Sequence, residues 1–410
     1  MKVLHVIPSL STKHGGPSFA LPLILRALSQ TGVRADVATT DDDGPGARLA
    51  VPLGVRVNQD WERPTPDRAS SQFQDPTSHA VGGTFYFHKQ TEFYKFSHPL
   101  GRWAARHVAD YDLVHIHALF SYASISAGRA ASRCGVPFII RPLGVLNRWG
   151  MENRRRLIKS LSFRFIERPL LRRAAAMHYT SRQEQIEAEQ AGATARAAVV
   201  PLGIDTRQFE RLPGPDLFLK RFPQAAGRPL ALFLSRLDAK KGLDLLLPAF
   251  ARARARHPDA LLVVAGSGDQ AYVASLQNVA RRLGLERDVL WPGFLEGNEK
   301  LSALAAAAIF ILPSYSENFG IALVEALAAG LACVTAEGVA VSAEVRQYDA
   351  GLVVRAETAE LAGALDRLLA DPGLRARLGG NARRLAAERF SLACMGAALH
   401  KLYTEILAAP

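Results

Sequence analysis

Two glutamates, Glu317 and Glu325, are the residues whose type and spacing first point to chemistry. They lie where the apolar strand Ile309–Leu312 gives way to a polar turn and then to a helix that begins near Gly320 and stops at Gly330. The free amides at the start of such a helix favour a phosphate group. Carboxylates beside a phosphate would serve as acceptors for hydroxyl groups, one of a sugar and one of a ribose. Taken singly, a helix cap and a solvated helix residue are the simpler interpretations of the two acids.

Two histidines, His115 and His117, alternate along the apolar run Leu113–His117 and therefore share one face of a strand. A two-histidine metal site is one interpretation, but no third ligand is evident in the sequence. The interpretation that we favour has His117, the last residue of the strand, opening into a cleft. His115 is then a buried histidine with its hydrogen bonds satisfied.

The segment Ser11–Ser18 joins the first predicted strand to the first predicted helix and contains the pair Gly15 and Gly16. Its pattern is neither that of a Walker A loop nor GxGxxG. Two glycines allow the backbone to reach into a cleft, whereas the simpler interpretation is a plain turn with Ser18 as the N-cap.

Arg141 ends the fourth predicted parallel strand, in the segment Ile140–Gly150. A strand-end position brings its guanidinium near the cleft, where it would contact a phosphate or the acceptor. A salt bridge at the end of the strand is nearly as good an interpretation.

The elements that must position these residues are short apolar strands alternating with helical segments. Near-continuous apolar strands between helices predict parallel sheets covered on both faces. The pattern runs twice, with a break at Pro201–Asp205, and predicts two doubly wound α/β domains facing a cleft. The predicted strands are Val3–Ile7, Ala35–Thr39, Leu113–His117, Phe138–Ile140, Ala197–Val200, Leu230–Leu234, Ala260–Ala265, Val289–Trp291, Ile309–Leu312 and Ala332–Thr335.

The predicted domains cover residues 1–203 and 204–390, and residues 391–410 form a C-terminal helix expected to pack back toward the first domain. Residues 41–80 contain three consecutive acids, five prolines and few periodic apolar residues. We expect them to form a long irregular insertion in the first domain, of a kind that can shape an acceptor pocket.

Composition is that of a globular chain of 410 residues, 49% of them hydrophobic. No apolar run approaches the ~20 residues that a membrane span needs, and the apolar N-terminal run is too short for a signal peptide. Three cysteines lie far apart without a CxxC pattern, which is typical of reduced thiols and not of a disulfide framework or zinc site. These features predict a cytoplasmic protein.

Most of the net charge of +12 lies in the first half of the chain, where residues 1–203 hold 26 Lys and Arg against 16 Asp and Glu. The densest stretch, residues 154–173, has eight basic residues and one acid, Glu167. Such a surface attracts nucleic acid, anionic lipid or phosphate-bearing substrates. Without a nucleic-acid motif or interleaved stacking aromatics, we expect no nucleic acid partner. An anionic membrane surface, with the protein peripheral on the inner face of the cell membrane, and a merely solubilising helix face are equally good interpretations.

Several segments, taken in order and spacing, resemble glycosyltransferase family 4, the group 1 retaining glycosyltransferases of GT-B fold. Ile309–Gly330 is similar to the E-x7-E motif of that family, and Ser235–Asp244 to the first strand–helix turn of its donor domain. Nearly the whole chain is covered, and Arg141–Arg156 resembles the bacterial exopolysaccharide-type members. The remaining similar segments are Val264–Gly268, Pro292–Phe294 and Pro201–Asp205 with Phe209. Departures occur at Gly330–Val334 and at Gly338-Val339, where relatives have G-x-P-V-V and a glycine pair.

The resemblance implies transfer of a sugar from a nucleoside-diphosphate sugar to a hydroxyl of a polysaccharide, lipid-linked or other glycan acceptor, with retention at the anomeric carbon. It implies no cofactor and no metal, because Arg236, Lys241 and the helix amides would stabilise the departing diphosphate. Glu317 would orient the sugar, Glu325 hold the ribose and His117 support the reacting sugar. The remaining residues implied in donor binding are Gly15, Gly16, Phe294, Asn318, Phe319, Gly320 and Ile321.

Other functions compete with this one. A metal-dependent transferase would need a DxD-type motif, which Asp110–Asp112 and Asp41–Asp43 match formally, although neither is expected at the end of a strand. Nucleotide-sugar epimerases and phosphorylases share the fold, and no motif for the pyridoxal phosphate of the phosphorylases is seen. A non-catalytic membrane-surface scaffold would use residues 154–173.

Overall fold

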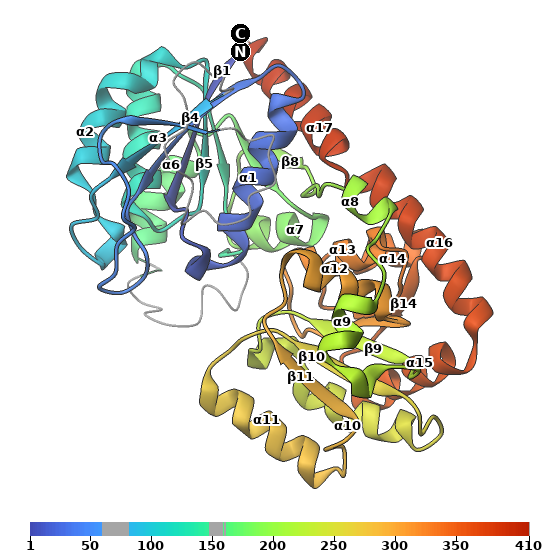
Figure 1. The fold of residues 1–410 in the computed structure, drawn as a ribbon. Coiled ribbons are helices and arrows are strands. Elements are labelled where there is room, and N and C mark those ends of the chain that lie inside the picture. Colours follow the sequence, from blue (N-terminus) through green and yellow to red (C-terminus); the bar gives the residue numbers. More distant parts are fainter. Residues whose placement is uncertain (60–81, 147–158, 160, 410) are drawn as a thin grey trace. The chain divides into compact units, whose positions relative to one another are not determined.

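The computed structural model describes residues 1–59, 82–146, 159 and 161–409 of the chain. The chain divides into two compact units. Unit 1 comprises Met1–Gly203 together with Leu392–Pro410, and unit 2 comprises Ile204–Ser391. Each unit is built on one largely parallel sheet, and in Figure 1 unit 1 runs from blue to green with its C-terminal helix in red, whereas unit 2 runs from green to red.

The sheet of unit 1 has eight strands in the order β3-β4-β2-β1-β5-β6-β7-β8. All neighbours pair in parallel except β3 and β4, which are antiparallel. The strands are β1 Lys2–Ser9, β2 Arg34–Thr40, β3 Arg56–Gln59, β4 Gly82–Phe87, β5 Leu113–His117, β6 Phe138–Arg141, β7 Ala176–Tyr179 and β8 Ala197–Val199.

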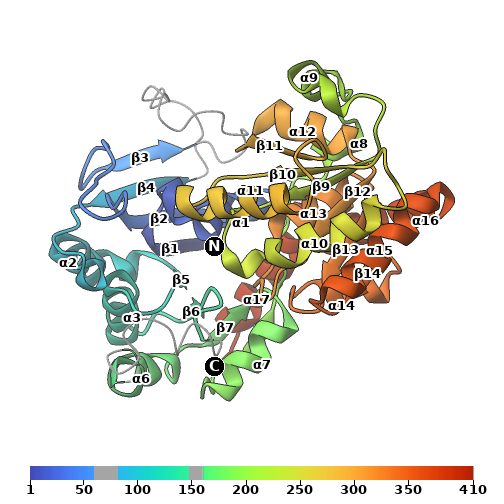
Figure 2. The same ribbon diagram turned by 90° about the horizontal axis from the view of Figure 1, so that it is seen from below.

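Helices cover both faces of this sheet. On one face α2 (His98–His107), α3 (Tyr122–Cys134) and α6 (Arg168–Leu171) pack on an apolar core, and Figure 2 shows these three helices together along one side of the unit. The other face carries α1 (Gly16–Ser29) and α17 (Leu392–Leu407) (Figure 1), whereas Ala188 of α7 (Arg182–Gln190) packs into the apolar core of the first face. Gly396 lets α17 approach α1 closely, since a Cβ there would lie 2.4 Å from the Ala27 carbonyl oxygen. The C-terminal helix is therefore an integral layer of unit 1.

The sheet of unit 2 has six strands, all parallel, in the order β11-β10-β9-β12-β13-β14. They are β9 Leu230–Leu234, β10 Leu261–Ala265, β11 Val289–Gly293, β12 Ile309–Leu312, β13 Ala332–Ala336 and β14 Gly351–Val354. The helices are α8 Arg207–Glu210, α9 Asp216–Arg221, α10 Leu243–Arg254, α11 Gln270–Arg282, α12 Gly297–Ala306, α13 Ile321–Ala328, α14 Ser342–Gln347, α15 Thr358–Ala370 and α16 Pro372–Arg389.

All the apolar runs predicted as strands are strands, and the doubly wound α/β architecture of both units is confirmed. The sequence pattern missed β3, β4, β7 and β14. Glycines, aromatics or polar residues replace a run of branched apolar side chains in β3, β4 and β7, whereas β14 is apolar but only four residues long. The expectation that residues 41–80 are irregular throughout is wrong for Arg56–Gln59, because this segment pairs with β4 as an edge strand. Within the described parts of the chain, no helix is both long enough and apolar enough to cross a bilayer.

Candidate functional site

The loop that follows β9 brings a lysine to the end of a neighbouring strand. It forms a short 3₁₀ turn, Ala239–Lys241, which Asp238 caps and Gly242 ends in a left-handed conformation with φ of 70°. A Cβ at Gly242 would lie 2.3 Å from the Pro313 carbonyl oxygen, so only glycine permits this approach. Lys241 is thereby held beside the loop that follows β12.

Lys241 and Glu317 form an ion pair in that position. Their side chains are 10% and 20% exposed, so the pair is largely shielded yet still reachable from solvent. The backbone of Glu317 is fixed on both sides, since its amide donates to the Gly338 carbonyl at 3.0 Å and its carbonyl accepts from the Ala340 amide at 2.9 Å. Glu317 is therefore held in position by its backbone hydrogen bonds and its ion pair, and it does not cap the helix.

The helix α13 begins directly after this turn. Gly320, with φ of 87°, occupies the N-cap position and provides no side-chain acceptor for the first amides, which begin at Ile321. Phe319 is buried and meets Phe390 edge-on, with 5.7 Å between ring centroids. Asn318 is half-buried. The helix start can thus present amide donors to an anion.

Glu325, one turn into α13, pairs with Lys300 of α12 at 2.7 Å. The two side chains are 13% and 24% exposed, so Glu325 is not a solvated helix residue. Lys300 was not identified from the sequence. No local signal marks it, because its partner lies 25 positions away on another helix.

Arg236 completes the basic side of this loop cluster. It is exposed and has no ion-pair partner among the residues that the structure describes. Burial, together with the charges of Lys241 and Arg236, lowers the pKa of neighbouring Lys240, although Asp238 and Glu317 oppose this effect. The loop after β9 therefore carries several positive charges close together, and Asp238 and Glu317 partly offset them.

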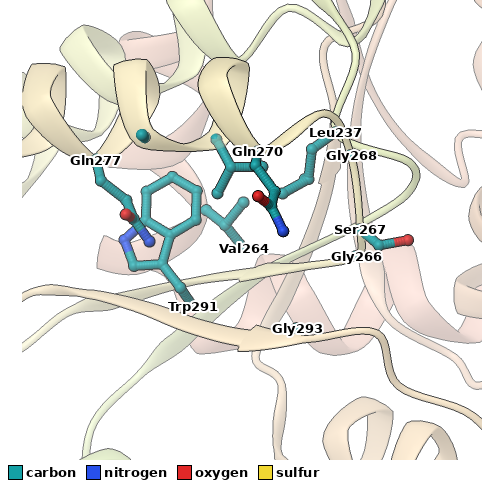
Figure 3. A pocket seen from close by; sticks show the side chains of 11 residues that line it. Leu237, Val264, Gly266, Ser267, Gly268, Gln270, Gln277, Trp291 and Gly293 are labelled. Atoms are coloured by element: carbon teal, nitrogen blue, oxygen red, sulfur yellow. The ribbon is translucent and has the colours of Figure 1, made fainter.

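A pocket of about 300 Å³ lies next to this loop, between the ends of β10 and β11 and the helix α11 (Figure 3). Trp291 and Gln277 lie side by side at one end of it, and Gln270 lies near Leu237 and Val264 at the other. Its walls are apolar side chains of the sheet and of α11, and its polar side chains are those of Gln270, Gln277 and Ser267. Such a pocket fits a flat heterocycle with hydrogen-bonding edges.

Two glycines that line the pocket let the segment after β10 approach the segment after β9 closely. A Cβ at Gly266 would lie 1.8 Å from the Ser235 carbonyl oxygen, and one at Gly268 would lie 2.2 Å from that of Leu237. Phe294, the first residue after β11, is 60% exposed. Its ring is thus available to a ligand at the same edge of the sheet.

In unit 1, the glycine loop between β1 and α1 is tied down by two acids. Asp42, 1% exposed at its side chain, pairs with Lys89 at 2.5 Å and with His14 at 2.9 Å. Asp43 accepts from Lys13 and from the Ser11 hydroxyl, both at 2.6 Å. The expectation that these acids do not lie at the end of a strand is wrong, because they directly follow β2 at its carboxyl end. Their partners come from this loop and from the segment that follows β4.

The helix α1 begins at Gly16, with Gly15 at the N-cap position and φ of 73°. Ser18 is inside the helix and donates to the Ser11 carbonyl oxygen at 2.7 Å, so its interpretation as the N-cap is wrong. Gly16 has open space where a Cβ would lie. The Gly15–Gly16 backbone is accordingly uncovered within unit 1.

Four histidines form a buried row on the face of the unit 1 sheet that lies under α1 and α17. They are His5 of β1, His115 and His117 of β5, and His178 of β7, all fully buried. The parallel register places His5 beside His115, and the rings of His115 and His117 stack with centroids 4.4 Å apart. Burial lowers the pKa of every member, to about 3 for His5 and His178. All four are neutral at physiological pH.

Hydrogen bonds set the tautomers of half the row. His178 Nε2 lies 3.0 Å from the Val200 carbonyl oxygen and must donate, so its Nδ1 accepts from His115 Nε2 at 3.2 Å. His115 Nδ1 then accepts from the Tyr403 hydroxyl of α17 at 2.7 Å. His115 is thus a buried histidine with both nitrogens bonded, as expected.

His117 does not open to solvent as expected. It is 0% exposed, and its Nε2 lies 2.9 Å from His5 Nδ1. His5 also supplies the third histidine that the sequence did not reveal, so a grouping of three potential metal ligands exists. A spacing of 2.9 Å is shorter than two ligands of one tetrahedral ion keep, and the guanidinium of Arg141 nearby would repel a cation. The row therefore fits a hydrogen-bonded network better than a metal centre.

Arg141 ends β6 and pairs in register with His117. It is only 2% exposed, and burial lowers its pKa to about 10, an effect that Glu184 partly opposes. The expected salt bridge is absent from the described part of the chain. The Glu184 oxygens instead accept from the Gly144 amide at 2.7 Å and from the amide and hydroxyl of Thr180.

Two doubly wound units, with basic and acidic loops gathered at the strand ends of the second, are typical of a GT-B protein. The family model of glycosyl transferases group 1 matches residues 217–385, and that of the glycosyl transferase 4-like domain matches residues 15–203. The chain belongs to the group 1 glycosyltransferases, glycosyltransferase family 4.

Curated relatives match over part of their length. D-inositol 3-phosphate glycosyltransferase of Corynebacterium aurimucosum is 34% identical over 218 residues, 51% of each chain. A GDP-mannose-dependent alpha-(1-6)-phosphatidylinositol monomannoside mannosyltransferase of Mycolicibacterium smegmatis is 29% identical over 219 residues, 52% of this chain and 57% of the relative. The chain thus spans about half the length of the curated relatives that it matches.

Solved structures share the fold along the whole chain. HepE of Anabaena, in complex with UDP and glucose, has a TM-score of 0.75 at 20% identity and is covered in full by 99% of this chain. Sucrose-phosphate synthase of Thermosynechococcus elongatus has a TM-score of 0.73 at 19% identity, with full coverage of both chains. At these identities the likeness establishes the GT-B fold.

Proposed function

We propose that this protein is a retaining glycosyltransferase that moves a sugar from a nucleoside-diphosphate sugar to a hydroxyl of a polysaccharide, lipid-linked or other glycan acceptor. The observation that carries the proposal is the Lys241–Glu317 ion pair beside the start of α13. A cation, a carboxylate and free helix amides at one strand edge provide partners for a phosphate and for sugar hydroxyls together.

The diphosphate would lie against Arg236, Lys241 and the amides of residues 318–321. In the absence of donor, Glu317 neutralises Lys241 and keeps it in place. When a diphosphate takes over the lysine, the carboxylate is released to accept from a sugar hydroxyl. Positive charge supplied by side chains and amides would stabilise the leaving group, so we propose that no metal and no cofactor take part.

The nucleoside would extend from the diphosphate toward the pocket at α11. Glu325, positioned by Lys300, would accept from the ribose hydroxyls. The base would enter the pocket of Figure 3, where Trp291 offers a ring face and Gln270 and Gln277 offer amides. Phe294 would border the pocket from the adjoining strand end.

Retention would proceed without a protein nucleophile. The departing phosphate would act as base on the face that the leaving group vacates. The acceptor hydroxyl then loses its proton to the phosphate as the new glycosidic bond forms.

Exopolysaccharide assembly at the inner face of the cell membrane is the setting that we propose. Two apolar side chains of the basic stretch are highly exposed, Leu161 at 59% and Phe165 at 67%, and Arg164 lies over the Phe165 ring at 5.6 Å. Exposed apolar groups among arginines suit an anionic lipid surface. Arg154, Arg155 and Arg156 of the same stretch lie outside the described residues.

A panel of nucleotide-sugars tests the proposal. Thermal shift of the full chain would identify the donor, mass analysis the product, and proton NMR of the new linkage its anomeric configuration. We expect one donor class to stabilise the protein and turnover to persist in EDTA. Inversion of configuration, or loss of turnover that added Mg²⁺ restores, would contradict the mechanism.

A further inference from the structure

Arg141 is a buried cation without a partner. Among the described residues, none accepts a hydrogen bond from its guanidinium, and its Nε is fully shielded from solvent. Glu184, whose charge acts on Arg141, accepts hydrogen bonds from Gly144 and Thr180 instead. Proteins rarely bury a charge unless it is paired, because the lost hydration costs several kcal/mol per ion.

The surroundings of Arg141 contain further unmet polar groups. Within the described parts of the chain, His5 Nε2, His117 Nδ1 and Thr39 Oγ1 are buried without hydrogen-bond partners. They lie with Arg141 on four neighbouring strands, β2, β1, β5 and β6, and the strand register puts all four side chains on one face. Unsatisfied groups are scarce in folded proteins, and a cluster of them marks a place where a ligand or ordered water completes the bonding.

The histidine pair must present one N–H to this cluster. If His5 Nδ1 donates to His117 Nε2, the proton of His117 lies on Nδ1, and if the bond runs the other way, the proton of His5 lies on Nε2. In either case one buried N–H lacks an acceptor. Arg141 adds its own N–H groups, so the cluster is rich in donors and carries a net positive charge.

We propose that unit 1 contains an anion site, formed by Arg141 with the His5–His117 pair, that binds a phosphate group carried by the acceptor. A planar guanidinium binds phosphate oxygens in pairs, and a neutral imidazole N–H adds a further donor without the cost of a second buried charge. The assignment to the acceptor rests on the proposed function, since the donor diphosphate has its own cations in unit 2. The anion site itself stands on unit 1 alone.

Backbone strain at the same edge of the sheet fits this use. Ala118 follows His117 with φ of 93°, and Leu143 lies two residues after Arg141 with φ of 60°. Positive φ angles cost conformational energy in residues other than glycine. Such strained residues cluster at sites where the fold positions groups for a ligand. The Ala118 amide donates to the Arg141 carbonyl oxygen at 2.9 Å, which couples the two loops.

Calorimetry on the full chain tests the site with glycerol 3-phosphate as probe and glycerol as its uncharged counterpart, at constant ionic strength. We expect the wild type to bind the phosphate and not glycerol. Arg141→Met should weaken binding by about 30-fold or more, and Arg141→Lys should restore part of it. Arg102→Met, at an exposed arginine of α2, is the matched control and should bind like the wild type.

Melting temperature without ligand supplies the second measurement. A cation kept for a ligand strains the empty protein, so Arg141→Met should melt higher than the wild type. A lower melting temperature together with unchanged phosphate binding would show a purely structural arginine and overturn the proposal.

Competition separates the two sources of phosphate. If UDP displaces glycerol 3-phosphate, the site belongs to the donor and the assignment to the acceptor is wrong. If both bind together, with UDP lost in Lys241→Met and glycerol 3-phosphate lost in Arg141→Met, the proposal holds. Phosphate binding through Arg141 in a protein that binds no nucleotide-sugar would leave the anion site standing and refute the proposed function alone.

Discussion

Lys241 donates to Glu317 across 76 positions of sequence, and this ion pair joins the loop after β9 to the loop after β12. The two strands are neighbours in the sheet, so their carboxyl ends meet at one edge. Under the proposed function, this pair would let a cation and an acid share the donor site, because each would hold the other in position until a phosphate and a hydroxyl of the donor replace it.

Glu317→Gln should cripple transfer while leaving the protein folded. The amide keeps the size of the side chain but loses the charge that positions Lys241 and accepts from the sugar. We expect turnover to fall by about 100-fold or more, which corresponds to roughly 3 kcal/mol of lost transition-state stabilisation. Steady-state kinetics measures this.

Glu337→Gln is the matched control, because Glu337 is an exposed acid that contacts Arg346 on the surface of the same unit. It should turn over like the wild type. Activity of Glu317→Gln within a few-fold of that control would remove Glu317 from the site.

Trp291→Ala should weaken donor binding more than it slows the reaction. The substitution removes one wall of the pocket at α11, and loss of a stacking ring costs about 1–3 kcal/mol per base. We expect the KM for the donor to rise by about 10-fold or more, with kcat changed little. Equal affinities of both proteins for UDP would place the base elsewhere.

Which parts of the site the sequence predicts depends on how far apart along the chain the contacting residues lie. The helix start at Gly320 and the glutamates around it follow from a strand, a turn and a helix within 22 residues of one another. The loop that holds Lys241 is equally local. By contrast, Tyr403 meets His115 across 288 positions, and His5 meets His117 across 112. Strand order and register decide such contacts, and no periodicity in the chain encodes them.

The same limit explains the incorrect expectation for His117. Its place at the end of an apolar strand indicates an opening to solvent, but the ring is covered by His5 from the adjacent strand. A strand-end residue is open only if its neighbours in the sheet are small, and the neighbours were unknown. Asp42 and Asp43 show the converse, since they lie at a strand end but are paired with lysines from distant segments.

Acid should destabilise the protein through the histidine row. The folded-state pKa of each buried histidine is lowered below the ordinary value of 6.5. Below that value these histidines bind protons in the unfolded chain but stay neutral in the folded protein. Stability therefore falls with decreasing pH, by about 1.4 kcal/mol per pH unit for each histidine, and the effect is absent above about pH 7.

His115→Gln isolates one member of the row, because an amide can accept from Tyr403 and donate to His178 in place of the imidazole. Urea denaturation at pH 5, 6 and 7 should show a stability slope smaller by about 1.4 kcal/mol per pH unit than in the wild type. His98→Gln, at an exposed histidine of α2, should leave the slope as it is. Identical slopes in all three proteins would mean that burial does not lower the pKa of His115 in the folded protein.

Glu167→Gln should stabilise the protein in alkaline solution. Glu167 is fully buried, and burial raises the pKa of its carboxyl group to about 7. One oxygen accepts from the Phe120 amide at 3.2 Å, and the other has no hydrogen-bond partner among the residues that the structure describes. A raised pKa means that the folded protein holds a proton which the unfolded chain releases above about pH 4.5. The stability of the wild type therefore declines as the pH rises from there to about 7, by roughly 3 kcal/mol in all.

Glutamine cannot ionise, so the stability advantage of Glu167→Gln over the wild type should grow over that interval and then stay constant up to pH 8. Denaturation curves at pH 5 and 8 measure the difference, and Glu189→Gln, at an exposed acid of α7, should show none. An advantage of equal size at both pH values would mean that the carboxyl group is ionised throughout and paired in the folded protein.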